Sequence, residues 1–142
     1  MDCVFCKIVS REIPFVFVYK SSFCTAFMDI KPMNPGHVLV IPDFHYEETK
    51  LLRSTICSDL FETAKEIGYA MKSGELKAEG INFFLSEGKA AGQEISHIHL
   101  HVIPRYTDDG IRLKSPNTHN ADLTELKDKA SQIIKQMNGY LV

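Results

Sequence analysis

The sequence lacks the features that mark membrane, secreted and nucleic-acid-binding chains. No apolar run approaches the roughly 20 residues that a membrane-spanning helix requires. The first residues, MDCVFCKIVS, contain an acid at position 2 and no long apolar segment, so they do not resemble a secretory signal. The formal net charge is −2, which excludes the strongly basic surface typical of a nucleic-acid-binding domain. We therefore expect a cytoplasmic protein that has no nucleic-acid or membrane partner.

Internal repeats, low-complexity segments and linkers rich in Pro, Gly or Ser are also absent. The chain has 142 residues, of which 44% are hydrophobic and 24% charged, so we expect a single globular domain over residues 1–142. The four cysteines are not expected to form disulfides in the cytosol. Cys24 and Cys57 stand in apolar surroundings, which predict small buried side chains.

Short strands with close connections flank one long helical segment. Alternating apolar residues and turn residues predict five strands, at 15–20, 23–30, 37–42, 81–86 and 95–103. Apolar residues recur at helical spacing within 47–73, with Ser58 as the N-cap and Gly74 as the stop. Strands and helices do not alternate one for one, so the predicted fold class is α+β with an antiparallel sheet.

A second helix is predicted over residues 121–138 at the C-terminal end. Its apolar residues fall on one helical face, so we expect that face to point inward. The inward set is Leu123, Leu126, Ala130, Ile133, Ile134 and Met137.

Three of the six histidines stand in one short stretch, HIHLHVIPRY, at 97–106. A period of two is that of a strand, so His97, His99 and His101 are predicted to share one face, with the aliphatic residues between them on the core face. Pro104 is expected to end the strand. The outer two Cα atoms of a straight strand would lie about 13 Å apart, so the three imidazoles could hardly share one metal ion. Divided roles are therefore favoured over three unrelated surface histidines.

A glycine-containing loop, GKAAGQEIS, directly precedes the histidines. Gly88 and Gly92 permit positive φ and let backbone N–H groups approach a ligand, and Gln93 adds an amide donor. Such a loop can hold a phosphate against a nucleophile, although it lacks the Walker pattern. His99 is flanked on both sides and is predicted to be the best shielded imidazole. A neutral imidazole can attack phosphorus and form a covalent phosphohistidine, with His101 and Gln93 stabilising the phosphoryl oxygens.

Cys3 and Cys6 form a C-x-x-C pair. This spacing indicates a redox pair or half of a zinc site, and a reduced pair with no metal is the remaining alternative.

Three segments resemble the histidine triad (HIT) family, whose motif is His-φ-His-φ-His-φ-φ with φ hydrophobic. They are CVFCKIVSREIP, AFMDIKPMNPGHVLVIP and AAGQEISHIHLHVIPRY, and together they extend the resemblance over nearly the whole chain. The resemblance implies a homodimeric α+β fold with a five-stranded antiparallel sheet, a long central helix region and a C-terminal helix. It also implies hydrolysis or transfer of a nucleotidyl group of a phosphate-linked purine nucleotide, with no cofactor needed for catalysis.

The resemblance also implies roles for individual residues. His99 is similar to the nucleophile that becomes nucleotidylated, and His101 to the third histidine, which contacts the phosphate. His37 resembles the upstream histidine that orients the middle one or sits beside the phosphate. Asp29 resembles the acid that binds the ribose hydroxyls, and Gln93 and Gly92 belong to the nucleotide-binding set. The apolar wall around the base is implied for Phe5, Ile8, Phe27 and Ile30.

Bacterial-type members of the family bind zinc through two cysteines and two histidines, which implies a structural zinc site here. The matching positions are Cys3, Cys6, His45 and His97. Ser86 stands where the best-known branch has an Asn contacting the leaving side, and Glu94 stands where some branches have Ser or Thr.

The leaving group is therefore left open between the amine of an adenosine 5′-phosphoramidate and the nucleotide of a dinucleoside polyphosphate. A nucleotide-binding or scaffolding dimer with vestigial activity is a second hypothesis. A zinc-dependent hydrolase with its metal on the triad is a third, and the 13 Å span, about the length of five strand residues, argues against it.

Overall fold

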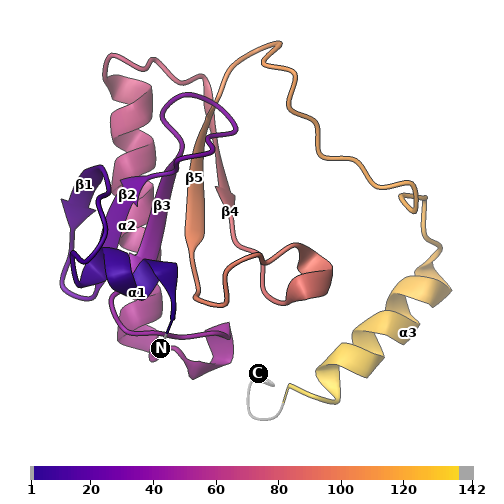
Figure 1. Ribbon diagram of the computed structural model, residues 1–142. Coiled ribbons are helices and arrows are strands. Elements are labelled where there is room, and N and C mark those ends of the chain that lie inside the picture. Colours follow the sequence, from indigo (N-terminus) through magenta and orange to yellow (C-terminus); the bar gives the residue numbers. More distant parts are fainter. Residues whose placement is uncertain (1, 138–142) are drawn as a thin grey trace. The chain divides into compact units, whose positions relative to one another are not determined.

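The computed structural model describes residues 2–137 and divides the chain into two compact units that meet between Ile111 and Arg112. The first unit holds all the strands found among residues 2–137 (Figure 1). Its elements are α1 (Val4–Val9), β1 (Phe17–Lys20), β2 (Cys24–Met28), β3 (Val38–Pro42), η1 (Thr49–Leu51), α2 (Ser54–Ser73), β4 (Gly80–Phe84), η2 (Lys89–Ala91) and β5 (Leu100–Arg105). The second unit holds α3 (Leu123–Ile134). Among the described residues, no helix combines the length and the apolar character that crossing a membrane requires.

The five strands form one antiparallel sheet in the order β1-β2-β3-β5-β4. β5 lies between β3 and β4, so His101 stands directly opposite Leu39 on one side and Phe84 on the other. The predicted α+β class and five-stranded antiparallel sheet are confirmed. The sheet thereby places the third histidine of the motif in its interior.

Alternation along the central strands gives the sheet two apolar faces, because successive strand side chains point to opposite sides. One face packs against α2, and its buried residues include Ala26, Val40 and Val102. The other face packs against α1, and its buried residues include Phe27, Leu39 and Ile41. α1 and α2 accordingly cover opposite faces of the sheet (Figure 1). His101 is paired with Leu39 and therefore faces the α1 side.

The segment that carries the histidines differs from the prediction in its backbone. β5 begins at Leu100, so His97 and His99 precede the strand, but the three rings still lie on the α1 side of the sheet, because Phe5 contacts His97 and His99, and His99 contacts His101. Pro104 does not end the strand; it pairs with Ile81 inside β5, where its missing N–H is tolerated. The aliphatic side of the prediction is confirmed, because the residues between and after the histidines are buried: Ile98, Leu100 and Val102.

α2 starts at Ser54 with Arg53 as its N-cap, so the prediction of Ser58 as N-cap was wrong. The helical phase extends a turn earlier because Ile56 is buried in the contact with the sheet. Gly74 is the C-cap, as predicted. Cys24 is fully buried as expected, whereas Cys57 lies exposed on α2, against the prediction.

α3 in the second unit begins with Asp122, whose carboxylate accepts the N–H of Glu125 at 2.9 Å. Its predicted inward residues are all exposed, because α3 is the one helix among the described residues of its unit and packs against no other element within it. The prediction of a buried face was therefore wrong. The prediction of one domain over residues 1–142 stays a prediction.

Candidate active site and metal centre

The first unit contains two clusters of histidine, cysteine and aspartate side chains. One includes His97 and the other His101, the two histidines that flank His99 in the motif. In each cluster the possible ligand atoms lie within 4.8 Å of one another. The first cluster consists of Cys3, Cys6, His45 and His97, and the second of Asp29, His37 and His101. The outer histidines of the triad therefore belong to different clusters.

The first cluster has the dimensions of a tetrahedral zinc site. Cys3 Sγ lies 3.5 Å from His97 Nδ1, Cys6 Sγ lies 3.4 Å from His45 Nδ1 and Cys6 Sγ lies 3.7 Å from His97 Nδ1. Zinc bonds of about 2.3 Å to sulfur and about 2.05 Å to nitrogen, at tetrahedral angles, place those atoms about 3.6 Å apart. Cys3 and Cys6 are three residues apart at the start of α1, so helical geometry puts both thiols on one side.

In His97 and His45 the Nε2 atoms face hydrogen-bond acceptors, which leaves the Nδ1 atoms free to bind a metal ion. His97 Nε2 donates to the carbonyl oxygen of Pro42 at 2.9 Å, and His45 Nε2 lies 3.4 Å from Glu47 Oε1. Nδ1 of each neutral ring then carries a lone pair, and a hydrogen-bonded outer nitrogen is the usual support of a metal-bound histidine. Burial lowers the pKa of His97 and so keeps it in the neutral, ligating form. These four residues could therefore hold a zinc ion.

Without a cation the surroundings oppose ionisation of the Cys6 thiol. Burial raises the pKa of Cys6, and its neighbour Cys3 raises it further. A bound cation reverses this, because a coordinated thiol loses its proton. The donor set is thus chemically suited to a metal ion.

His99 is held with one ring nitrogen free. Its Nδ1 lies 2.7 Å from the carbonyl oxygen of His97, and a carbonyl can only accept, so Nδ1 carries a proton, and the neutral form of this ring has its lone pair on Nε2. Phe5 meets the ring edge-on at 5.2 Å between centroids. His99 is 6% exposed and His97 is fully buried, so the prediction that His99 is the best shielded imidazole was wrong. The arrangement nevertheless gives His99 the form that a nucleophile requires.

The rings of His37 and His101 are hydrogen-bonded to each other, and a backbone N–H group decides which of their nitrogens carry the protons. The N–H of Met33 donates to His37 Nδ1 at 3.0 Å, so the proton of neutral His37 is on Nε2. His37 Nε2 lies 2.8 Å from His101 Nδ1, which must accept, and this leaves an N–H donor at His101 Nε2. His37 thus contacts the third histidine of the motif; His99 takes its orientation from a backbone carbonyl. The proton between His37 Nε2 and His101 Nδ1 occupies the two nitrogens that a metal ion at the second cluster would need.

Burial keeps both of these rings neutral. It lowers the pKa of His37, against the opposing effect of Asp29. Burial, with His99 and His37 nearby, lowers the pKa of His101 to about 4. Asp29 Oδ2 lies 3.6 Å from His37 Nε2, and Oδ1 accepts the N–H of Lys31 at 2.8 Å. Asp29 therefore stands beside the histidines with part of its carboxylate still free to accept.

The predicted phosphate loop has the expected backbone. Gly88 and Gly92 flank η2 with φ of 84° and 88°, conformations that favour glycine. Gln93 Oε1 accepts the N–H of Gly88 at 2.7 Å, while its buried Nε2 has no partner among the described residues. A buried amide nitrogen without an acceptor is costly, so it is suited to donate to a bound ligand. Ser86 is buried and Glu94 is exposed.

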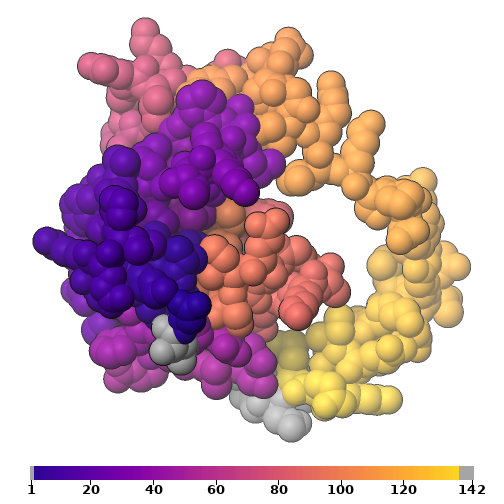
Figure 2. Space-filling view, viewed as in Figure 1, coloured from indigo at the N-terminus to yellow at the C-terminus, as the bar shows by residue number. Residues whose placement is uncertain are grey.

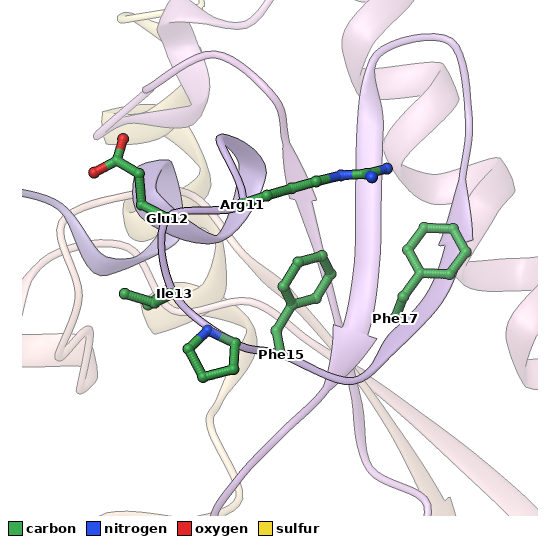
Figure 3. A pocket seen from close by; sticks show the side chains of 6 residues that line it. Arg11, Glu12, Ile13, Phe15 and Phe17 are labelled. Carbon is green, nitrogen blue, oxygen red and sulfur yellow. The ribbon is translucent and has the colours of Figure 1, made fainter.

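The proposed apolar wall is only partly assembled. Phe5, Ile8 and Phe27 are buried together between α1 and the sheet, whereas Ile30 is 91% exposed. The N-terminal segment, indigo in Figure 2, covers part of this face. A separate, open surface pocket of about 550 Å³ is lined by residues 11–15 and Phe17, and none of the histidines lines it (Figure 3).

The groups that sequence reasoning missed are mostly backbone atoms. The Met33 N–H, the His97 carbonyl and the Pro42 carbonyl decide which nitrogen of each ring carries a proton. No side-chain pattern encodes them. The short loop before His37, KPMNPGH, is the one sequence signal that bears on the first of them.

The fold and the two clusters define a small α+β protein with a histidine site beside a central strand of an antiparallel sheet. The model of the HIT domain family matches residues 10–108, and the chain belongs to this family. An HIT-like protein of Borreliella burgdorferi is 38% identical over 133 residues, which cover 93% of this chain and 96% of that one. The crystal structure of a Bacillus subtilis member of the HIT family superposes with a TM-score of 0.87 at 33% identity, covering 96% of this chain and 98% of the other.

Two further similarities concern chemistry. The adenosine 5′-monophosphoramidase of Schizosaccharomyces pombe is 34% identical over 109 residues, covering 77% of this chain and 78% of that enzyme. A zinc-bound histidine triad family protein of Mycobacterium smegmatis superposes with a TM-score of 0.73 at 32% identity, covering 95% of this chain and 97% of the other.

Proposed function

We propose that this protein is a nucleotidyl hydrolase or transferase that acts on a phosphate-linked purine nucleotide through a covalent nucleotidyl intermediate on His99. Adenosine 5′-phosphoramidate is the proposed substrate. The observation that carries the proposal is the hydrogen bond from His99 Nδ1 to the His97 carbonyl, which directs Nε2, and not Nδ1, to act as the nucleophile. The similarity to a monophosphoramidase supports the substrate class.

The reaction divides into two substitutions at the α-phosphorus. His99 Nε2 attacks phosphorus, the bond from phosphorus to the leaving nitrogen breaks, and that nitrogen takes up a proton. Water then attacks phosphorus, the bond to His99 breaks, and AMP and a proton are released. The Nδ1–H of His99 remains hydrogen-bonded to the His97 carbonyl oxygen throughout, which stabilises the positive charge on the modified ring.

The remaining side chains bind and polarise the nucleotide in this proposal. The Nε2–H of His101 and the free amide nitrogen of Gln93 donate to phosphoryl oxygens, and Gly92, whose N–H donates to the Lys89 carbonyl oxygen, shapes the loop that carries Gln93. His37 holds His101, and the free carboxylate oxygen of Asp29 accepts from the ribose hydroxyls. The base lies against the apolar wall of Phe5, Ile8, Phe27 and Ile30.

The first cluster is proposed to hold a structural zinc ion. Zinc bound there would supply a crosslink between α1 and the bend before β5, and the proposed catalytic step needs no cofactor. The support is the fit of four donor atoms to a tetrahedral site and the zinc-bound relative. Because His97 offers its ring to the metal and its carbonyl to His99, the zinc site holds the nucleophile indirectly.

The protein is further proposed to be a cytoplasmic homodimer. β4 is an edge strand of the sheet, and unpaired edges that carry apolar residues tend to pair with another chain. Phe83 on β4 and Phe61 on α2 are 41% and 52% exposed and lie 5.6 Å apart. A second copy of this surface would cover them.

The test is AMP release from adenosine 5′-phosphoramidate by the wild type and by His99→Ala. We expect turnover by the wild type and a loss of at least about a thousandfold in the variant. Inertness of both proteins towards this substrate, with turnover of a dinucleoside polyphosphate, would transfer the proposal to that substrate. Nucleotide binding without turnover of either would favour the scaffolding alternative.

A further inference from the structure

The loop between β2 and β3, residues 29–37, is tethered to the end of β5 by the side chain of Asn34. Asn34 Nδ2 donates to the carbonyl oxygen of Pro104 at 2.9 Å and to Asp109 Oδ2 at 2.9 Å. The backbone oxygen of Asn34 accepts the N–H of His37 at 3.1 Å. The loop and the end of β5 lie at the same end of the sheet (Figure 1). Asn34 thus connects the chain after the histidine motif to the loop that ends in His37.

Asp109 is a rigid anchor for this tether. Its carboxylate accepts from Arg105 Nε at 2.7 Å and Nη2 at 2.9 Å, and from the backbone N–H groups of Tyr106 and Ile111 at 3.1 and 3.0 Å. The Asp109 side chain is 7% exposed. The hydrogen bonds from Arg105, above all, hold the pKa of Asp109 well below its ordinary range. An ionised carboxylate with this many donors is held firmly, and Asn34 is held with it.

The hydrogen bonds of the Asn34 side chain also affect the proton of His37. Met33, the residue before Asn34, donates its N–H to His37 Nδ1. The Met33 N–H must stay within reach of His37 Nδ1 to keep the His37 proton on Nε2. If this donor moves away, His37 can carry its proton on Nδ1, and Nε2 becomes an acceptor facing His101 Nδ1. His101 must then carry its own proton on Nδ1, and it loses the N–H donor at Nε2.

We propose that Asn34, Asp109 and Arg105 form a positioning cluster that fixes the tautomers of His37 and His101. The three residues touch neither His99 nor His101; they act through the Met33 N–H. Their effect on turnover rests on the proposed function, in which the His101 Nε2–H donates to the phosphoryl group. Their effect on the tautomers depends on no reaction.

The experiment is a long-range ¹H–¹⁵N correlation spectrum of the imidazole rings in the full-length protein at neutral pH, which reports the protonated nitrogen of each ring. Wild type is compared with Asn34→Ala and with a control, Asp59→Asn. Asp59 also anchors a turn, by accepting from Ser21 Oγ at 2.6 Å and the Phe23 N–H at 2.9 Å, but away from the histidines. We expect Nε2–H in both His37 and His101 of the wild type and the control, and a large Nδ1–H population in both rings of Asn34→Ala.

A folded Asn34→Ala protein with wild-type tautomers would overturn the proposal, because it would leave the cluster with a purely structural role. If Asn34→Ala does not fold, Asp109→Asn is assessed by the same criterion, since it keeps the size of the side chain and turns an acceptor of the Asn34 amide into a donor.

Turnover separates this proposal from the function. With adenosine 5′-phosphoramidate, kcat of the tautomer-shifted variant should fall about tenfold or more while KM stays within about threefold, because a donor used mainly in the transition state is lost. An inert wild type with shifted tautomers in Asn34→Ala would overturn the proposed function and leave the positioning cluster standing. Shifted tautomers with unchanged kcat would overturn the catalytic part of the inference.

Discussion

The carbonyl oxygen of His97 accepts the Nδ1–H of His99 at 2.7 Å, while the His97 ring lies among the cysteines of the first cluster. One residue therefore faces the candidate metal with its side chain and the candidate nucleophile with its backbone. In the proposed function, this relationship would make zinc binding and catalysis depend on the same bend before β5.

Loss of the proposed zinc site should destabilise the protein. We expect Cys6→Ser to abolish the binding of one zinc ion per chain and to lower the free energy of unfolding by about 3 kcal/mol or more, since metal binding is coupled to folding. For a chain of this size this corresponds to a Tm decrease on the order of 10 °C. Metal content by mass spectrometry and thermal unfolding measure both effects.

Cys57→Ser is the matched control, because Cys57 is an exposed thiol outside the cluster. It should retain the zinc and the Tm of the wild type. Equal metal content and stability in Cys6→Ser and Cys57→Ser would contradict the zinc assignment.

Acid should destabilise the protein through His101. The pKa of His101 is about 4 in the folded protein and about 6.5 in an unfolded chain. Between these values the unfolded state binds a proton that the folded state does not, so the free energy of unfolding falls as the pH is lowered from 6.5 towards 4. The slope contributed by one proton is at most about 1.4 kcal/mol per pH unit, and this contribution does not grow below about pH 4.

Denaturant unfolding of the wild type and of His101→Gln across this pH range isolates the effect. Both proteins keep the same cysteines and metal-site histidines, so acid release of zinc affects them alike. The free energy of unfolding of the variant should depend less steeply on pH, by the slope of up to one bound proton. Parallel curves for the two proteins would show that His101 is not protected from protonation.

The amide of Gln93 should matter more than its exposed neighbour. Gln93→Ala removes the one buried side-chain nitrogen without a partner among the described residues, and we expect kcat/KM to fall about tenfold to a hundredfold. Glu94→Ala alters an exposed side chain and should stay within about threefold. Steady-state AMP release measures both variants, and equal losses would mean that the loop acts through its fold and not through the Gln93 donor.

The dimer prediction depends on the exposed edge at β4. Phe83→Glu places a charge on that strand and should shift the protein towards monomers in sedimentation experiments. Phe44→Glu is the control, because Phe44 is 69% exposed after β3 and away from β4. A dimer that persists in Phe83→Glu would place the interface elsewhere.

Sequence reasoning predicted the side-chain faces better than the backbone. The alternation of apolar residues correctly placed Ile98, Leu100 and Val102 in the core, because burial alone decides which face of an extended chain is apolar. The same alternation continues through the bend at 97–99, where no ladder forms, so it could not show that β5 begins at Leu100.

In the candidate site, too, the side chains were predicted better than the backbone. Resemblance to the family supplied the residues of both clusters, and the structure brings them together. The sequence could not reveal which nitrogen of each ring is protonated, since backbone groups such as the Met33 N–H decide this. On α3, periodicity predicted the helix correctly, but a period cannot say which surface will cover Leu126 or Ile133.

The most direct test of the central claim is to quench the wild-type protein during turnover of adenosine 5′-phosphoramidate, digest it under alkaline conditions that preserve phosphohistidine, and map any nucleotidyl group by mass spectrometry. The proposed mechanism predicts the mass of AMP on the peptide that contains His99, located on His99 itself and absent from His99→Ala. Turnover with no adduct at any time, or an adduct on another residue, would contradict it.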